Sequence, residues 1–134
     1  AVLHSVDFKA PDLAYPLIVK PKNEAVSMGI KIVHNEDELR EAAQAIFDMF
    51  ENQPVLVEQY IEGREINVGL IGNNVPEALP PCEIVFGTKG PQIYTLEDKK
   101  GQSGREISWH CPAPIGQDLT AKAQQIARDA FAAL

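Results

Sequence analysis

Apolar and polar residues alternate in short stretches along the first part of the chain, and this alternation predicts β-strands. Over residues 15–21 it places Leu17 on one face of a strand and Lys20 on the other. Residues 28–33 are predicted to return as the second strand of a hairpin. The polar connection between the two strands is longer than a tight turn, so it is long enough to fold over a ligand.

A helix is predicted over residues 36–51. Asn35 is a suitable N-cap, and Glu38 three positions later has the spacing of a capping box. Glu36 is placed to pair with Arg40 one turn along. The apolar residues recur every three or four positions and form one face: Leu39, Ala42, Ala43, Ile46, Phe47 and Phe50. We interpret this helix as scaffold and assign it no chemistry.

Further strands are predicted over residues 54–60, 65–71 and 82–86. Residues 87–108 are rich in Gly, Lys, Asp, Glu and Ser, and they predict a loop. A last helix is predicted to be capped by Asp118 or Thr120. Its apolar positions are Ala123, Ile126, Ala127, Ala130, Phe131 and Leu134. Together these elements predict an α+β fold, in which a small antiparallel β-sheet is packed by helices.

Charge and composition exclude several classes of function. The net charge of −7 argues against a nucleic-acid partner, which normally requires a basic face. No stretch approaches the roughly 20 apolar residues that cross a bilayer, so no membrane span is expected. No signal peptide is apparent and there is no initiator Met, as in a piece trimmed from a larger protein. Cys82 and Cys111 stand apart without metal-ligand spacing and are interpreted as free thiols, which indicates a reducing cytoplasm.

Three charged residues at strand ends are the candidates for chemistry: Lys20, Glu58 and Glu65. An ammonium suits a phosphate oxygen, while a carboxylate accepts hydrogen bonds from an adenine amino group or from ribose hydroxyls. Local sequence leaves open the alternative that all three are simply solvated charges on strand ends.

Other groups of residues give only weak indications of a metal or catalytic site. The three histidines are scattered and lack zinc spacing, and no metal site is assigned. Ser103 and Ser108 have no base near them in sequence. Trp109, in an apolar run, is expected in the core.

Four segments in order resemble the ATP-grasp superfamily, and most of all its D-alanine–D-alanine ligase group. Residues 16–30 are similar to the phosphate-loop hairpin, and residues 55–68 to the adenine and ribose segment. Residues 94–99 resemble the ω-loop, and residues 111–113 the Pro-Ala that precedes a helix. The resemblance implies about 14–86 as the nucleotide-binding sheet and helix, about 87–110 as a mobile loop, and about 111–134 as the truncated start of the C-terminal ATP-grasp lobe.

For the triphosphate, the resemblance implies contacts from three side chains and one backbone segment. Lys20 would contact the α- and β-phosphates. Ser27, with the backbone around Met28 and Gly29, would cover the β- and γ-phosphates. Lys99 would close over the γ-phosphate as the catalytic residue.

For the nucleoside, the resemblance implies four further contacts. Glu58 would accept from the adenine amino group, and Gln59 and Ile61 would bracket the base through backbone groups. Glu65 would take the ribose hydroxyls. Lys20, Glu58 and Glu65 would therefore converge on one pocket for ATP.

The implied activity is that of a carboxylate–amine ligase, in which ATP forms an acyl phosphate and an amine then makes an amide. The cofactors would be ATP and Mg²⁺, with the magnesium ligands beyond residue 134. The partners would be a small carboxylate and amine, such as amino acids or peptides, together with the missing N- and C-terminal domains. This fragment alone is expected to be inactive.

The sequence departs from the family pattern in two places. Ala25 and Val26 stand where a Gly and a Ser are usual, and Lys100 replaces a second aromatic of the ω-loop. D-alanine is therefore one possible substrate among related ones. Two alternatives remain open: a non-catalytic nucleotide-binding or interaction module, and another ATP-grasp ligase such as a carboxylase-type subunit.

Overall fold

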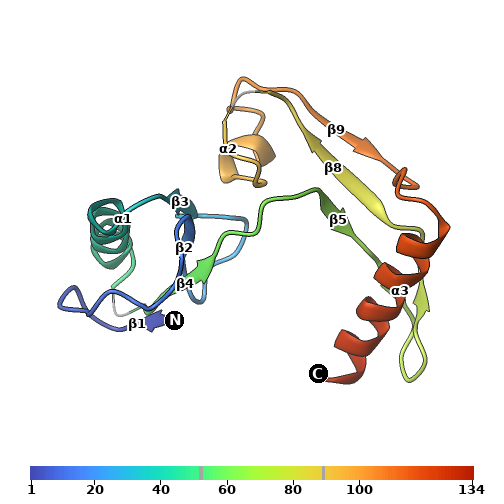
Figure 1. Cartoon of the computed structure of the whole chain (residues 1–134), viewed down its shortest axis with the longest axis horizontal. Helices are drawn as coiled ribbons and strands as arrows, with labels where there is room; N and C mark the ends of the chain where they lie inside the picture. The colour runs from blue at the N-terminus through green and yellow to red at the C-terminus, as the bar shows by residue number, and fades with distance from the viewer. Residues whose placement is uncertain (52, 89) are drawn as a thin grey trace. The chain divides into compact units, whose positions relative to one another are not determined.

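The computed structural model describes residues 1–51, 53–88 and 90–134, and Figure 1 traces their path. The chain divides into two compact units. The first unit contains residues 1–62 and 91–104, and the second contains residues 63–90 and 105–134. The sequence predicted boundaries near residues 86 and 110 between parts of a larger ATP-grasp protein. Those boundaries stay a prediction.

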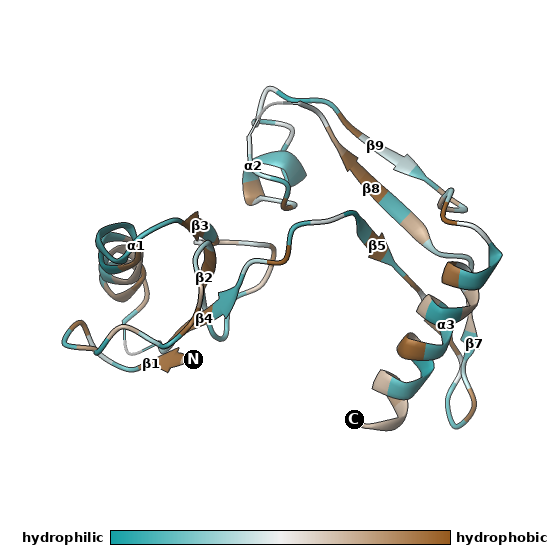
Figure 2. Ribbon diagram, in the orientation of Figure 1, coloured by the Kyte–Doolittle hydropathy of each residue, from teal (hydrophilic) through white to brown (hydrophobic). Residues whose placement is uncertain are grey.

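The first unit is built on a four-stranded antiparallel sheet with the order β1-β4-β2-β3. The strands are β1 (Val2–Leu3), β2 (Leu17–Pro21), β3 (Lys31–Val33) and β4 (Val55–Gln59). The predicted hairpin is confirmed, although its second strand begins only at Lys31. Alternation along β2 buries Leu17 and Val19 and leaves Lys20 only partly buried on the opposite face, as predicted. Figure 2 shows β2 and β3 mainly in brown, the colour of hydrophobic residues.

Helix α1 (Glu36–Met49) packs on one face of this sheet and completes the core. Its N-cap is Asn35, whose side chain accepts a hydrogen bond from the backbone N–H of Glu38 at 2.9 Å. The predicted pair between Arg40 and Glu36 is present at 2.6 Å. The buried residues of the helix are Leu39, Ala42, Ala43 and Ile46, while Phe47 and Phe50 pack partly buried against them. The predicted helix and its apolar face are therefore confirmed.

The second unit contains a three-stranded antiparallel sheet with the order β5-β8-β9 and a separate two-stranded ladder. The strands are β5 (Glu65–Asn67), β6 (Leu70–Ile71), β7 (Glu77–Ala78), β8 (Cys82–Phe86) and β9 (Ile107–His110). The single strand predicted over residues 65–71 is thus divided in two. Gly69 lies at the division, where its carbonyl accepts from Leu79 N at 2.8 Å. A Cβ on Gly69 would lie 3.2 Å from Leu79 Cδ1, which is closer than most such contacts, so glycine favours the close approach of the two chains here.

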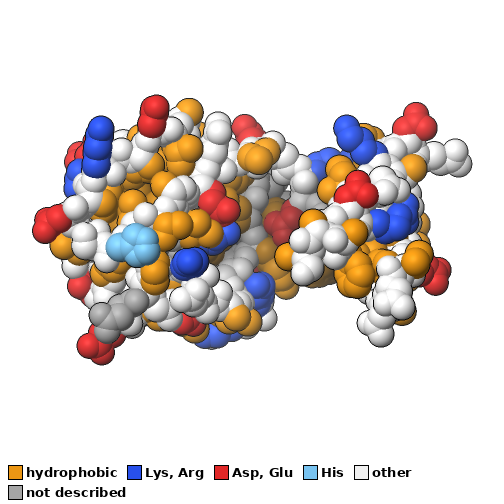
Figure 3. Space-filling model, turned by 90° about the horizontal axis from the view of Figure 1, so that it is seen from below, with side chains coloured by type: hydrophobic (Ala, Val, Ile, Leu, Met, Phe, Trp, Pro, Cys, Tyr) orange, Lys and Arg blue, Asp and Glu red, His pale blue; other side chains and the backbone are white. Residues whose placement is uncertain are grey.

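Helix α3 (Gln117–Ala132) confirms the predicted last helix but not its cap. Gly116 occupies the N-cap position with φ +74°, no side-chain cap forms, and the Thr120 hydroxyl instead donates to the Gly116 carbonyl at 2.8 Å. The Gln124 amide donates to the carbonyls of Ala78 and Leu79, both at 3.1 Å, which attaches the helix to the β7 end of this unit. No residue of α3 is buried, and Ile126 and Phe131 on its apolar face are exposed. Hydrophobic side chains at the molecular surface are visible in Figure 3.

The predicted loop over residues 87–108 contains more order than expected, and Lys89 within it lies outside the described residues. Helix α2 (Leu96–Lys99) interrupts it, and β9 begins at Ile107. Thr95 and Asp98 form a full capping box around the start of α2. This Thr-x-x-Asp spacing is a helix signal in the sequence. The polar composition of the segment led instead to the prediction of a loop. The expectation that Trp109 lies in the core is also wrong, because its side chain is 53% exposed on β9.

The two cysteines form a disulfide, so the prediction of free thiols is wrong. Glu83 on β8 lies directly opposite His110 on β9, and the next positions outward are Cys82 and Cys111, whose Cα atoms are 4.4 Å apart. The separation of 29 residues gave no local signal, because only the register of the two strands makes the cysteines neighbours. The inference of a reducing cytoplasm from free thiols therefore loses its basis.

Alkylation of the chain without prior reduction is expected to label neither cysteine, and reduction should expose both. Reduction or Cys82→Ser is expected to lower the free energy of unfolding by about 2–4 kcal/mol, because the unfolded chain regains conformational freedom. Mass spectrometry of the alkylated chain and denaturant unfolding measure the two effects. Two labelled cysteines in the untreated chain would contradict the disulfide.

Candidate functional site

Lys20 and Glu58 form an ion pair on the outer face of the four-stranded sheet, opposite the face that α1 covers. Lys20 lies across from Leu56, and Glu58 lies across from Ile18, so the two charged residues are diagonal neighbours on adjacent strands. Their side chains are 37% and 47% exposed. An ion pair this accessible adds little stability, which leaves both groups available to a ligand that offers better partners.

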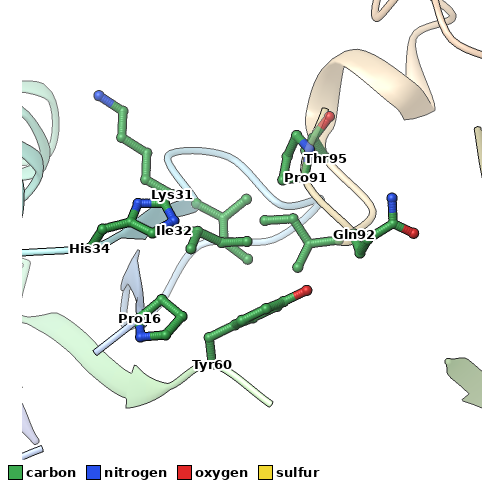
Figure 4. A pocket seen from close by; sticks show the side chains of 10 residues that line it. Pro16, Lys31, Ile32, His34, Tyr60, Pro91, Gln92 and Thr95 are labelled. Atoms are coloured by element: carbon green, nitrogen blue, oxygen red, sulfur yellow. The ribbon is translucent and has the colours of Figure 1, made fainter. Parts of the chain in front are cut away.

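A cavity of about 570 Å³ opens in the same unit. Ile32 in its wall pairs with Ile18, which in turn lies across from Glu58, so the cavity and the ion pair share one face of the sheet. Figure 4 shows Pro16, Ile32 and Tyr60 on one side of the space and the segment with Pro91, Gln92 and Thr95 on the other. The wall is completed by Ile30, Lys31, His34 and Ile93. A mainly apolar cavity with a few polar groups is typical of sites for flat organic ligands.

Lys99 and Ser27 meet although 72 residues separate them in sequence. The Lys99 ammonium, at the end of α2, donates to the Ser27 hydroxyl at 2.8 Å. The ammonium also lies 5.2 Å from the centre of the Tyr94 ring, in a cation–π contact. The predicted ω-loop lysine and the predicted phosphate-loop serine are therefore brought together within the first unit.

The backbone of the hairpin loop adopts left-handed conformations at Val26 (φ 54°), Ser27 (φ 62°) and Gly29 (φ 72°). A Cβ on Gly29 would lie 3.2 Å from two ring carbons of Pro21, so glycine is required there on two counts. Val26 is β-branched, and a left-handed conformation is strained for such a residue. Strain of this kind is commonly found at ligand clamps, and this loop carries the predicted phosphate contacts.

Val26→Gly is expected to raise the free energy of unfolding by about 1 kcal/mol, because release of the strain exceeds the entropic cost of glycine. Denaturant titration measures the change. Ala25→Gly is the matched control, because Ala25 lies in the same loop without a positive φ and should lose about 0.5–1 kcal/mol. Equal losses in both variants would show that Val26 is not strained.

The remaining predicted contact residues are Gln59, Ile61 and Glu65. Gln59 ends β4, and the exposed Ile61 follows Tyr60, whose N–H donates to the Pro16 carbonyl at 3.0 Å. Sequence reasoning named these two flanking residues and missed Tyr60 between them, which lines the cavity. Glu65 lies on β5 in the second unit, across from Ile84. Its convergence with Lys20 and Glu58 stays a prediction.

The second unit contains a cluster of charged residues that the sequence did not indicate. Arg64 Nε donates to Glu83 Oε1 at 2.5 Å, and its Nη2 donates to Glu83 Oε2 at 2.6 Å. His110 Nδ1 lies 3.6 Å from the same carboxylate. Hydrogen bonds from Arg64 hold the pKa of Glu83 below its ordinary value of 4.5, and burial opposes this shift.

The lowered pKa of Glu83 gives a stability contribution that is complete above the unfolded-state pKa of about 4.5 and is lost as the pH falls through the folded-state value. Glu83→Gln should therefore remove part of the acid sensitivity of the protein. The measurement is the free energy of unfolding of both proteins from about pH 6 to about pH 3. Curves that remain parallel over that range would contradict the shift.

No metal site is apparent in residues 1–51, 53–88 and 90–134: they contain no group of three or more His, Cys, Asp or Glu side chains arranged to hold an ion. The location of magnesium ligands beyond residue 134 stays a prediction.

The described helices include none that is both long and apolar enough to traverse a bilayer.

A family model described as D-ala D-ala ligase C-terminus matches residues 5–134. The chain belongs to the D-alanine–D-alanine ligase family. A D-alanine–D-alanine ligase of Syntrophobacter fumaroxidans is 38% identical over 133 residues, which are 96% of this chain and 40% of that protein. The corresponding enzyme of Thermosipho africanus is 36% identical over 123 residues, which are 91% of this chain and 32% of that protein. This chain therefore spans about 40% or less of these relatives.

Solved structures of the family agree with the fold. The VanG D-Ala:D-Ser ligase of Enterococcus faecalis superposes with a TM-score of 0.68 at 25% identity, covering 87% of this chain and 32% of that one. The D-alanine–D-alanine ligase of Coxiella burnetii gives a TM-score of 0.62 at 26% identity, covering 87% of this chain and 28% of that one. The resemblance to the D-alanine–D-alanine ligase group and the α+β fold class are thus confirmed.

Proposed function

We propose that this chain is the ATP-binding part of a ligase that joins a carboxylate to an amine through an acyl phosphate. One observation carries the proposal: the Lys20–Glu58 ion pair and the apolar cavity lie on the same face of the sheet. A nucleotide needs both kinds of surface, since its base is flat and largely apolar while its phosphates are anionic.

The cavity is the proposed site for the adenine base. Ile30, Ile32 and Ile93 provide apolar contacts, and the Tyr60 ring provides an aromatic wall. Glu58 accepts from the adenine amino group, which separates adenine from bases with a carbonyl at that position. Gln59 and Ile61 contribute backbone groups on either side of Tyr60.

The phosphates are the proposed ligands of Lys20, Ser27 and Lys99. When ATP binds, Lys20 exchanges the Glu58 carboxylate for the α- and β-phosphates. Lys99 exchanges the neutral Ser27 hydroxyl for an anionic phosphate oxygen, which is the stronger acceptor. The Ser27 hydroxyl and the backbone N–H groups near Gly29 then face the β- and γ-phosphates.

The proposed chemistry is transfer of the γ-phosphoryl group of ATP to a carboxylate, which releases ADP, followed by attack of an amine on the acyl carbon, which forms the amide and expels phosphate. Lys99 stabilises the charge that develops on the transferred phosphoryl group, and the protein acts mainly by positioning and neutralisation. Glu65 holds the ribose hydroxyls. The chain alone is expected to be inactive, and the cytoplasm is the proposed location of the intact protein.

The test measures ADP release by the intact protein with ATP, magnesium and pairs of D-amino acids or small peptides. ADP production that requires both a carboxylate and an amine supports the proposal. D-alanine and D-serine are the first amines to compare, since relatives named D-alanine–D-alanine and D-Ala:D-Ser ligase are both similar to this chain. ATP binding without ADP release for any pair would instead favour a non-catalytic nucleotide-binding module.

A further inference from the structure

Helix α2 is a single turn of four residues inside the segment that joins β8 to β9 (Figure 1). One turn of helix is unstable by itself in water, because several backbone angles are fixed for very few hydrogen bonds. Main-chain hydrogen bonds run from Lys99 N to the Thr95 carbonyl at 3.2 Å and from Lys100 N to the Leu96 carbonyl at 3.0 Å. The order of α2 therefore depends strongly on the side chains that cap it.

Asp98 is the side chain that closes this turn. Its carboxylate accepts hydrogen bonds from the Thr95 backbone N–H at 2.8 Å and from the Thr95 hydroxyl at 3.0 Å. The Asp98 backbone N–H donates to the same hydroxyl at 3.3 Å. Asp98 is only 8% exposed, and a carboxylate so far from water is costly unless it is hydrogen-bonded. These reciprocal bonds fix both residues and the turn between them.

Lys99 follows Asp98 directly and is exposed. Successive residues of a helix point about 100° apart, so the buried Asp98 leaves Lys99 on the outside of the turn. The Lys99 ammonium donates to the Ser27 hydroxyl at 2.8 Å and lies 5.2 Å from the centre of the Tyr94 ring. The stem of a lysine is long and flexible, so its ammonium keeps one place only if the backbone that carries it is fixed.

We propose that Asp98 is a positioning residue for Lys99: by closing the capping box of α2, it holds the Lys99 ammonium beside Ser27, where the γ-phosphate of ATP would bind. This inference rests on the proposed nucleotide-binding function. The contacts that carry it all lie within the first unit. Asp98 is buried and bonded to Thr95, so it acts through Lys99 and not on the phosphate directly.

The test compares the dissociation constants of ATP and ADP for the intact protein by calorimetry, with magnesium present and without a carboxylate or amine substrate. ADP lacks the γ-phosphate, so the ratio of the two constants reports the contacts to that group. The intact protein should bind ATP roughly tenfold more tightly, the scale of one charge-assisted hydrogen bond. Lys99→Ala should remove most of this preference.

Asp98→Ala opens the capping box and should reduce the preference for ATP to about threefold or less, while the dissociation constant of ADP changes by less than about twofold. Glu97→Ala is the matched control, because it removes an exposed carboxylate from the same helix without touching the Thr95–Asp98 bonds. Its ratio should not change. Since both variants remove one negative charge, a difference between them reports the cap.

Thr95→Val is a second variant, which keeps the shape of the side chain but lacks the hydroxyl of the cap. It should lower the preference for ATP partly, because the backbone N–H of residue 95 can still donate to Asp98. Thr95 also lines the cavity, but a change in that wall would alter the binding of ATP and ADP alike and leave their ratio unchanged.

An unchanged ratio in Asp98→Ala, an equal fall in Glu97→Ala, or equal weakening of both nucleotides overturns the positioning role. If Asp98→Ala does not fold, as thermal unfolding would show, Thr95→Val decides, and an unchanged ratio there overturns it. An intact protein that binds neither nucleotide refutes the proposed function. An intact protein that binds ADP as tightly as ATP, or that keeps its preference in Lys99→Ala, refutes only the γ-phosphate contact of Lys99 and with it this inference.

Discussion

Leu17→Ala is expected to lower the free energy of unfolding by about 2–5 kcal/mol. Leu17 has 0% of its surface exposed and lies on β2, between Val33 of β3 and Gln59 of β4. Its side chain packs in the core between the four-stranded sheet and α1. Truncation removes apolar burial and leaves a cavity in a region held on several sides, so little relaxation can compensate.

Denaturant unfolding of the chain measures this effect. Leu119→Ala provides the control, because Leu119 on α3 is 57% exposed and its truncation should change stability by no more than about 0.5 kcal/mol. A loss for Leu17→Ala no larger than that of the control would mean that the core does not lie between β2 and α1.

Lys20→Ala should weaken ATP binding by about 1–3 kcal/mol, which corresponds to roughly 5- to 150-fold in the dissociation constant. The side chain supplies a positive charge to the proposed phosphate site, and its loss also leaves Glu58 without its partner. Adenosine carries no phosphate, so its dissociation constant should change far less. Calorimetric titration of the intact protein with both ligands separates the phosphate contact from a general loss of the site.

Lys9→Ala is the matched control for Lys20→Ala, since Lys9 is an exposed lysine of the same unit and should leave both dissociation constants unchanged. Equal weakening of ATP and adenosine by Lys20→Ala would indicate damage to the sheet. Unchanged binding of ATP would remove Lys20 from the proposed site.

One departure from the family pattern lies in the hairpin loop, where the structure shows its physical effect. Val26 replaces a usual Ser and occupies a left-handed conformation that disfavours β-branched residues. The loop therefore keeps a strained shape with an apolar side chain where the family offers a hydroxyl. A different carboxylate or amine substrate is one consequence to test, and the comparison of amines in the ADP-release assay addresses it.

Local signals in the sequence determined much of the scaffold. The hairpin and α1 follow from periodicity and from the Asn35 cap, because these effects act within a few residues of one another. The order of the segments determined the family, which the comparisons confirm. Even α2 was encoded locally in the spacing of Thr95 and Asp98, although the polar composition around it hid the signal.

The tertiary structure decided which distant residues become neighbours. It brought Lys99 to Ser27 and joined Cys82 to Cys111. It also paired Arg64 with Glu83. The physical reason is the same in each case: such contacts depend on strand register and on the path of the chain between elements, and periodicity within one element carries no information about either.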